Sequence, residues 1–181
     1  SSDLYGGLNY HFFAGNGESN ASERSGRIDK LYSLSLSQDF SNYFFYQFYT
    51  DYRLSKDGKD DEFTGQVFAG YKNENFRIGF QYTYQENKLM KSEKKGDLQL
   101  YSVPVIYKYI DKVSFIFRYS YYIAEEEQNY QQQAFIGGME YKIRDNILLL
   151  PNIIYNDYNF ENANNLGKDV ITRLTLSYYF K

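Results

Sequence analysis

The stretch VITRLTLSYYF, residues 170 to 180, alternates along its whole length between apolar and mostly polar side chains. Successive side chains of a β-strand point to opposite faces of the sheet. Val170, Leu174 and Phe180 therefore share one apolar face, whereas Arg173 belongs to the other face. The stretch predicts a strand that has an apolar surrounding on one side and polar groups on the other.

The same alternation recurs along the rest of the chain and predicts ten strands. We expect them at residues 4 to 13, 30 to 37, 44 to 54, 63 to 72, 76 to 85, 101 to 109, 113 to 123, 134 to 142, 147 to 158 and 170 to 180. The ninth is apolar on both faces and contains Pro151, which removes one ladder donor. Its outer face is predicted to carry Ile147, Leu149, Ile153 and Tyr155.

The predicted connections alternate between long polar loops and short turns. The loops are expected at residues 15 to 27, 55 to 62, 86 to 97, 125 to 131 and 161 to 169. Gly, Ser, Asn and charged residues dominate them, which is typical of surface loops. Four short turns join the other strand ends, so the two ends of the predicted sheet differ.

Composition favours an all-β protein in one domain over residues 1 to 181. The chain has 22 Tyr and 15 Phe but only 2 Pro, and aromatic residues are enriched in strands and at membrane interfaces. No run of eighteen apolar residues predicts a transmembrane helix. The net charge of −3 gives no support to a nucleic-acid partner.

A final strand with an apolar residue at every second position and an aromatic residue near its end resembles the C-terminal β-signal of bacterial outer-membrane β-barrels. An even strand number and long loops opposite short turns are also typical of that class. The resemblance implies a transmembrane up-and-down antiparallel β-barrel of ten strands in the bacterial outer membrane. It also implies contact with lipid and lipopolysaccharide, and insertion by the barrel assembly machinery.

Alternation by itself leaves open which face points outward. A soluble lipocalin-like carrier also alternates, with its apolar face inward around a ligand. Two features favour the membrane barrel. Aromatic residues lie at both ends of the apolar face, and the long loops and the short turns lie at opposite ends of the strands. Volume also favours it, because the apolar side chains of all ten strands would overfill the inside of a barrel of this size.

The polar face would then line the inside of the barrel, and its charged residues are mostly basic. The predicted lumen-lining residues are Asp51, Arg53, Lys72, Arg77, Lys108, Arg118, Glu140, Lys142 and Arg173. Seven of the nine are basic, which favours a narrow channel that prefers anions. The alternative is an interior plugged by hydrogen-bonded side chains, because eight-stranded barrels are filled and ten strands is close to that size.

The sequence predicts no enzyme, no cofactor and no metal site. His11 is the only histidine, and it lacks neighbouring serine or carboxylate residues in a local catalytic motif. Outer-membrane barrels include a protease family of similar strand count and lipid A modifying enzymes, but their motifs are not recognisable in this chain. The acidic runs at residues 57 to 62 and 125 to 127 lack the ligand spacing of a calcium loop.

Three functions stay open from the sequence: a porin-like transport channel, an adhesin-like barrel that binds at the cell surface through its loops, and a structural or assembly-partner barrel with a plugged lumen. A surface or envelope protein partner is not identified by any motif.

Overall fold

The protein is described from a computed structural model that covers residues 7–16, 30–40, 42–54, 61–87, 96–125, 130–144, 146–160 and 167–179. Ten strands run through these ranges: β1 (Asn9–Asn16), β2 (Lys30–Asp39), β3 (Phe44–Leu54), β4 (Glu62–Lys72), β5 (Phe76–Asn87), β6 (Gly96–Ile110), β7 (Val113–Glu125), β8 (Tyr130–Arg144), β9 (Ile147–Phe160) and β10 (Lys168–Tyr178). The predicted all-β class and the ten strands are confirmed. Within these ranges we find no helix of the length and apolarity needed to cross a membrane.

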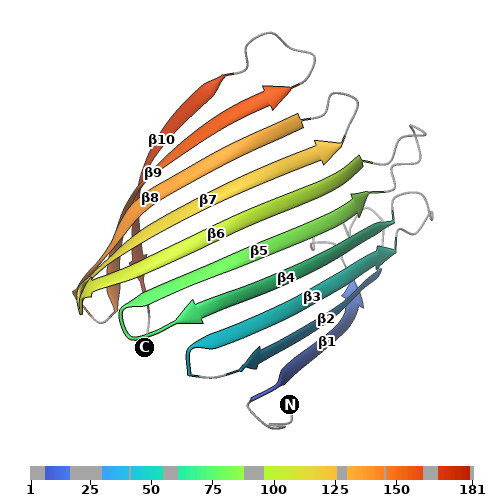
Figure 1. Cartoon of the computed structure of the whole chain (residues 1–181), viewed down its shortest axis with the longest axis horizontal. Helices are drawn as coiled ribbons and strands as arrows, with labels where there is room; N and C mark the ends of the chain where they lie inside the picture. Colours follow the sequence, from blue (N-terminus) through green and yellow to red (C-terminus); the bar gives the residue numbers. More distant parts are fainter. Residues whose placement is uncertain are drawn as a thin grey trace.

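The strands form one sheet in which chain order and spatial order are the same. Each strand pairs antiparallel with the next, from β1 through to β10. This is the predicted up-and-down arrangement, and Figure 1 shows it as a twisted, curved sheet. In the described part of the chain, no Cα of β1 lies within 8 Å of a Cα of β10, so the sheet has two free edges.

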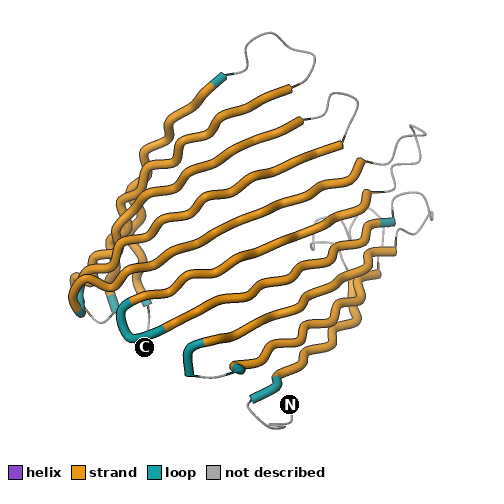
Figure 2. The backbone as a smooth tube through the Cα atoms, viewed as in Figure 1, coloured by secondary structure: helices purple, strands orange, loops and turns teal. Residues whose placement is uncertain are grey.

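The connections differ at the two ends of the sheet, as predicted. Those that follow β2, β4, β6 and β8 have two to four residues, whereas the other five have four to thirteen. The described turns lie together at one end of the strands (Figure 2). In the β4–β5 turn, the Asn73 side-chain oxygen accepts hydrogen bonds from the backbone N–H groups of Asn75 at 2.9 Å and Phe76 at 2.7 Å. This turn chemistry is typical of Asn.

Several strands extend farther than predicted, mainly at the loop end. β4 begins at Glu62, β5 reaches Asn87, β6 begins at Gly96 and β10 begins at Lys168. Backbone pairing continues through polar residues that the sequence pattern assigns to loops, because the hydrogen bonds between strands join backbone groups and do not depend on side-chain type. The rest of the predicted loops, and residues 1–6, 180 and 181 at the chain ends, lie outside the described residues.

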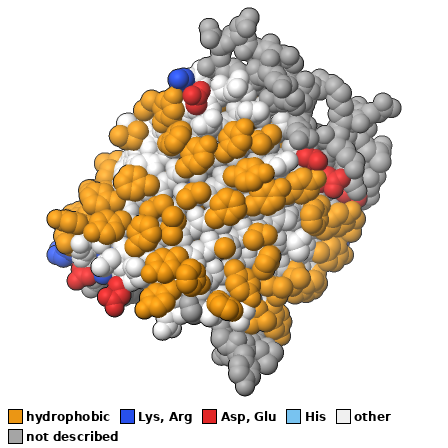
Figure 3. Space-filling model, viewed as in Figure 1, with side chains coloured by type: hydrophobic (Ala, Val, Ile, Leu, Met, Phe, Trp, Pro, Cys, Tyr) orange, Lys and Arg blue, Asp and Glu red, His pale blue; other side chains and the backbone are white. Residues whose placement is uncertain are grey.

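The outer face of the sheet is apolar over its whole middle. Phe48, Phe80, Phe117 and Phe135 point outward from four strands and are 47–52% exposed. Hydrophobic side chains cover most of the face seen in Figure 3, and charged side chains appear only near the strand ends. A soluble calyx would turn this face inward, so the structure agrees with the membrane barrel and not with the lipocalin-like alternative.

Tyrosines on the outer face form a belt near the loop end. Their hydroxyl groups donate hydrogen bonds to polar side chains nearer the loops, each at 3.0 Å: Tyr52 to Asp61, Tyr84 to Asp97, Tyr101 to Gln99 and Tyr121 to Gln131. The rings of Tyr82, Tyr101 and Tyr121 follow one another across β5, β6 and β7. Rings in the apolar layer with hydroxyls toward water are the arrangement of a membrane interface.

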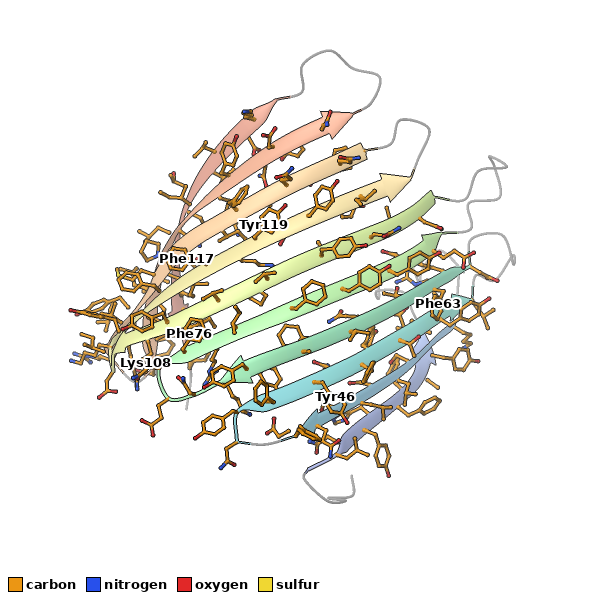
Figure 4. All side chains as sticks on the ribbon, viewed as in Figure 1. Tyr46, Phe63, Phe76, Lys108, Phe117 and Tyr119 are labelled. Atoms are coloured by element: carbon orange, nitrogen blue, oxygen red, sulfur yellow. The ribbon has the colours of Figure 1, made fainter. Side chains whose placement is uncertain are left out.

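A second aromatic group lies on the same face at the turn end. The rings of Tyr43 and Tyr71 stack with centroids 6.0 Å apart, and Phe44 meets Tyr71 edge-on at 5.3 Å. Phe63, Phe117 and Tyr119 lie on the outer face between or beside the two groups (Figure 4). The outer face therefore has the two aromatic girdles and the apolar band of a membrane-spanning sheet.

The register settles the facing of β9. Tyr155 pairs with Phe135 of β8, whose side chain points outward, and Ile153 is 54% exposed. Leu149 pairs with Tyr141 in the same row. The outer-face assignment of this strand is therefore confirmed, and Leu148, Leu150 and Ile154 point to the inner face.

Phe80→Arg tests which face meets lipid. We place Phe80 near the middle of the apolar band, where an arginine should lower the free energy of unfolding by about 2 to 4 kcal/mol, because its charge loses hydration. The measurement is urea-induced unfolding in lipid vesicles, followed by the gel shift between unboiled and boiled protein. Gln81→Arg is the control, because the next side chain points inward. Equal destabilisation by both variants would contradict the assigned facing.

Candidate functional site on the inner wall

The inner wall is the face of the sheet opposite the apolar band, and all nine predicted site residues lie on it. Cross-strand pairing sets Lys72 beside Arg77, and Lys108 and Glu140 on either side of Ser114. Arg118 pairs with Ile136, and Arg173 pairs with Asn152. Their common face follows from the register. That they line an open lumen stays a prediction.

The nine residues do not form one ring at a single height of the wall. Asp51 and Arg53 lie toward the loop end of β3, and Lys72, Arg77 and Lys108 lie at the turn end. Glu140 and Lys142 also lie at the turn end, on β8, whereas Arg118 and Arg173 lie farther along β7 and β10. The structure therefore divides the predicted site into a turn-end group, a loop-end pair and two single arginines.

Three of the basic side chains are paired with carboxylates. Arg53 Nη1 lies 2.9 Å from Glu62 Oε2 across β3 and β4. Lys72 Nζ contacts both carboxylate oxygens of Asp39, at 3.0 and 3.1 Å. These pairs cancel part of the positive charge of the wall, so a count of basic residues overstates its potential.

Lys108 Nζ lies 2.7 Å from Asp111 Oδ1 in the β6–β7 turn. The hydrogen bond from Lys108 lowers the pKa of the Asp111 carboxyl, and the Lys108 charge adds to this effect. Because the folded-state pKa is depressed, the pair persists at neutral pH and is lost only as the pH falls through that lowered pKa. Lys108 is thus neutralised locally at physiological pH.

Three carboxylates of the inner wall were missed by the sequence prediction. Asp39 pairs in register with Phe45, Glu62 with Arg53, and Asp169 with Asn156, all inner positions. The predicted excess of seven basic to two acidic residues is therefore wrong: two plus three gives five acidic residues on the described wall. They were missed because their strands extend into stretches that read as turn or loop.

Arg118 is held on the inner wall by hydrogen bonds to two serine side chains. Its Nε donates to Ser102 Oγ at 2.8 Å and to Ser120 Oγ at 3.1 Å. Ser102 is only 1% exposed, so this anchor lies inside the wall. Among the described residues Arg118 has no carboxylate partner, and neutral hydroxyls orient its guanidinium without cancelling its charge. No signal in the sequence marks these two serines beyond their inner-face spacing.

The turn end of the inner wall contains a cavity of about 220 Å³. Arg77, Lys108 and Glu140 line it, with Ile106 and Ile116 between them on β6 and β7. Phe76 and Lys108, seen together at the turn end in Figure 4, also border it. This cavity is the place where the structure brings predicted site residues together.

Nothing in the described part of the chain forms a group of three or more His, Cys, Asp or Glu that could hold a metal ion. His11 lies on β1 opposite Ser35 and is exposed.

Comparison with known proteins places this geometry in a structural class. No protein-family model and no curated protein sequence matches the chain. Outer-membrane expressed OmpT of Vibrio cholerae matches in structure with a TM-score of 0.68 and 16% identity, over 94% of this chain and 61% of that chain. In-vitro folded OmpT of Vibrio cholerae matches with a TM-score of 0.68 and 14% identity, over 96% and 64%. The NanC porin matches with a TM-score of 0.61 and 13% identity, over 84% and 80%.

The chain has the fold of bacterial outer-membrane β-barrel proteins. These neighbours are all outer-membrane barrel proteins. Their structural similarity confirms the predicted fold and, with it, the predicted bacterial outer-membrane location. The setting also implies an environment of outer-membrane lipid and lipopolysaccharide. The chain spans less than two thirds of the length of the OmpT chains it matches.

The prediction that this outer-membrane barrel is not an enzyme has to be corrected. The comparison that overturns it is the likeness to the OmpT proteins, at 14–16% identity. An identity this low shows the fold alone, and that fold is also used by outer-membrane proteases. A missing local motif is therefore no ground for excluding catalysis in this barrel.

Replacing both Ser102 and Ser120 by Ala tests the anchor of Arg118. We expect the free energy of unfolding to fall by about 1 to 3 kcal/mol, because the half-buried Nε–H loses both acceptors. Urea-induced unfolding in lipid vesicles measures this change. The control replaces Ser35 and Ser37, which are inner-face serines of β2, by Ala. An equal loss in both double variants would show that the hydroxyls do not hold Arg118.

Proposed function

We propose that the protein is a narrow outer-membrane diffusion channel that prefers anions. The observation that carries the proposal is Arg118, a guanidinium held on the inner wall by Ser102 and Ser120 without a neutralising carboxylate. A fixed positive charge in a narrow aqueous path raises the local anion concentration and lowers the barrier for anion passage.

Two further arginines support the proposal. Arg77 and Arg173 form no ion pair with any residue that the structure describes, whereas Arg53, Lys72 and Lys108 do. The positive potential is therefore assigned to three unpaired guanidinium groups and not to all seven basic residues of the wall.

The similarity to the NanC porin also supports a channel, because that chain is named a porin and the match covers 80% of it. For this chain, the solute, the lipopolysaccharide contacts and recognition of the terminal strand by the barrel assembly machinery are parts of the proposal. Outward-facing Leu174 and Leu176, which are 69% and 64% exposed, give β10 the apolar face that such recognition would use.

A plugged barrel is the second candidate, and apolar side chains on the inner wall favour it. The rings of Phe45 and Phe68 meet with centroids 5.5 Å apart. Ile136, Ile154 and Ile171 are cross-strand neighbours on β8, β9 and β10. If β1 and β10 pair, these two groups would lie on opposite parts of a small interior and narrow it.

Replacing Arg118 and Arg173 by Gln tests the channel. Wild-type protein in planar bilayers under a KCl gradient should show small conductance and a reversal potential on the anion side, because fixed cations attract chloride. The double variant should lose most of this preference and keep its folding. Arg144→Gln is the matched control, because it removes the same charge near the β8–β9 turn, off the inner-wall row.

Two results would count against the channel. A folded wild-type protein that gives no conductance would favour the plugged barrel. An unchanged reversal potential in the double variant would show that the anion preference arises elsewhere in the chain.

A further inference from the structure

The strands that line the cavity at the turn end of the inner wall carry one basic and one acidic side chain that lack a described partner. Arg77 of β5 and Glu140 of β8 both line it. Neither forms an ion pair or a hydrogen bond with any residue in the part of the chain that the structure describes. Opposite charges that share a cavity and do not pair with each other are available to a ligand.

The space between the two charges is apolar at its floor. Arg77 pairs in register with Ile106, Ile106 with Ile116, and Ile116 with Gly138 of β8, two residues from Glu140. The three strand spacings between β5 and β8 add to about 14 Å at the backbone. Arg77 and Glu140 therefore stand at opposite sides of a strip of isoleucine side chains.

Apart from Glu74, the other polar groups of the cavity are either neutral or already paired with another residue. Lys108 is paired with Asp111 at 2.7 Å, and the Asn73 side-chain oxygen accepts two backbone hydrogen bonds of its own turn. Glu74 lies on the exposed turn at the edge of the cavity, and Ser114 adds a neutral hydroxyl. The unpaired cation is thus on one side and the unpaired inner-strand carboxylate is on the other.

We propose that this cavity binds a small zwitterion with an apolar body, of the α-amino acid class. Arg77 would donate hydrogen bonds to the carboxylate, Glu140 would accept hydrogen bonds from the ammonium group, and Ile106 and Ile116 would contact the side chain. A volume of about 220 Å³ has room for roughly seven waters at about 30 Å³ each, which suits a molecule of this size. The site rests on the proposed channel for solute access and adds a substrate class to it.

The test uses three probes that share one side chain: leucine, which is zwitterionic; N-acetylleucine, an anion; and leucinamide, a cation. Each is added on the turn side of wild-type protein in planar bilayers, and the duration of current interruptions is measured. Leucine should interrupt the current about tenfold longer than either analogue, because each analogue loses one charge-assisted contact.

Two single variants separate the two contacts. Glu140→Gln should shorten the leucine interruptions to those of N-acetylleucine, and Arg77→Gln should shorten them to those of leucinamide. Asp157→Asn is the control, because it removes a carboxylate near the loop end, off the inner-wall row and outside the cavity, and should leave all three probes unchanged. Both variants should keep the gel shift of folded protein.

Three results would overturn the site. Equal interruptions by the three probes in wild-type protein would exclude a zwitterion site, while the Arg118-dependent anion preference would still stand. Loss of folding in both Glu140→Gln and Arg77→Gln would indicate a structural pair. If the wild-type protein has no conductance, the channel proposal fails, and the site is then tested by saturation-transfer NMR with detergent-solubilised protein. Absence of leucine binding in that measurement would overturn the site.

Discussion

The fold depends on pairing every backbone N–H and C=O group that enters the hydrocarbon layer, where no water can replace a missing partner. Strands β2 to β9 each meet this requirement with two antiparallel neighbours. β1 and β10 have one neighbour each. With ten strands in up-and-down order, the two edge strands run antiparallel to each other, which is the direction that barrel closure needs.

Because each inner strand of the sheet pairs with a neighbour on both sides, its side chains can point only to the two faces of the sheet. One face meets lipid and the other faces the inside of the barrel. The outer face has aromatic belts at both ends and phenylalanines such as Phe48 and Phe117 between them. Tyrosine hydroxyls reach polar groups at the loop end, for example Tyr84 to Asp97. The outer face thus positions the sheet at a definite depth, and that depth decides which inner residues lie within the membrane thickness.

Local pairing, and not overall composition, decides the electrostatics of the inner wall. Arg53 and Lys72 are neutralised across strands by Glu62 and Asp39. Arg118 is oriented by neutral serines and keeps its charge. The same contrast holds in the turn-end cavity, where Lys108 is paired with Asp111 while Arg77 and Glu140 have no described partner. The proposed function of this barrel therefore rests on the few charges that the fold leaves without partners.

Alternation with period two was sufficient to predict the ten strands, the placing of long loops and short turns at opposite ends, and the common face of the nine predicted charged residues, because these features are local. Even β9, apolar on both faces and interrupted by Pro151, was assigned correctly. Local pattern did not predict that Glu62 and Asp169 belong to strands, since backbone pairing continues through polar sequence. Nor did it predict that Arg77 and Glu140 share a cavity, because that depends on the register of four strands. Only the tertiary structure decides which distant charges meet, because each register is set by the pairing of whole strands and not by the identity of single residues.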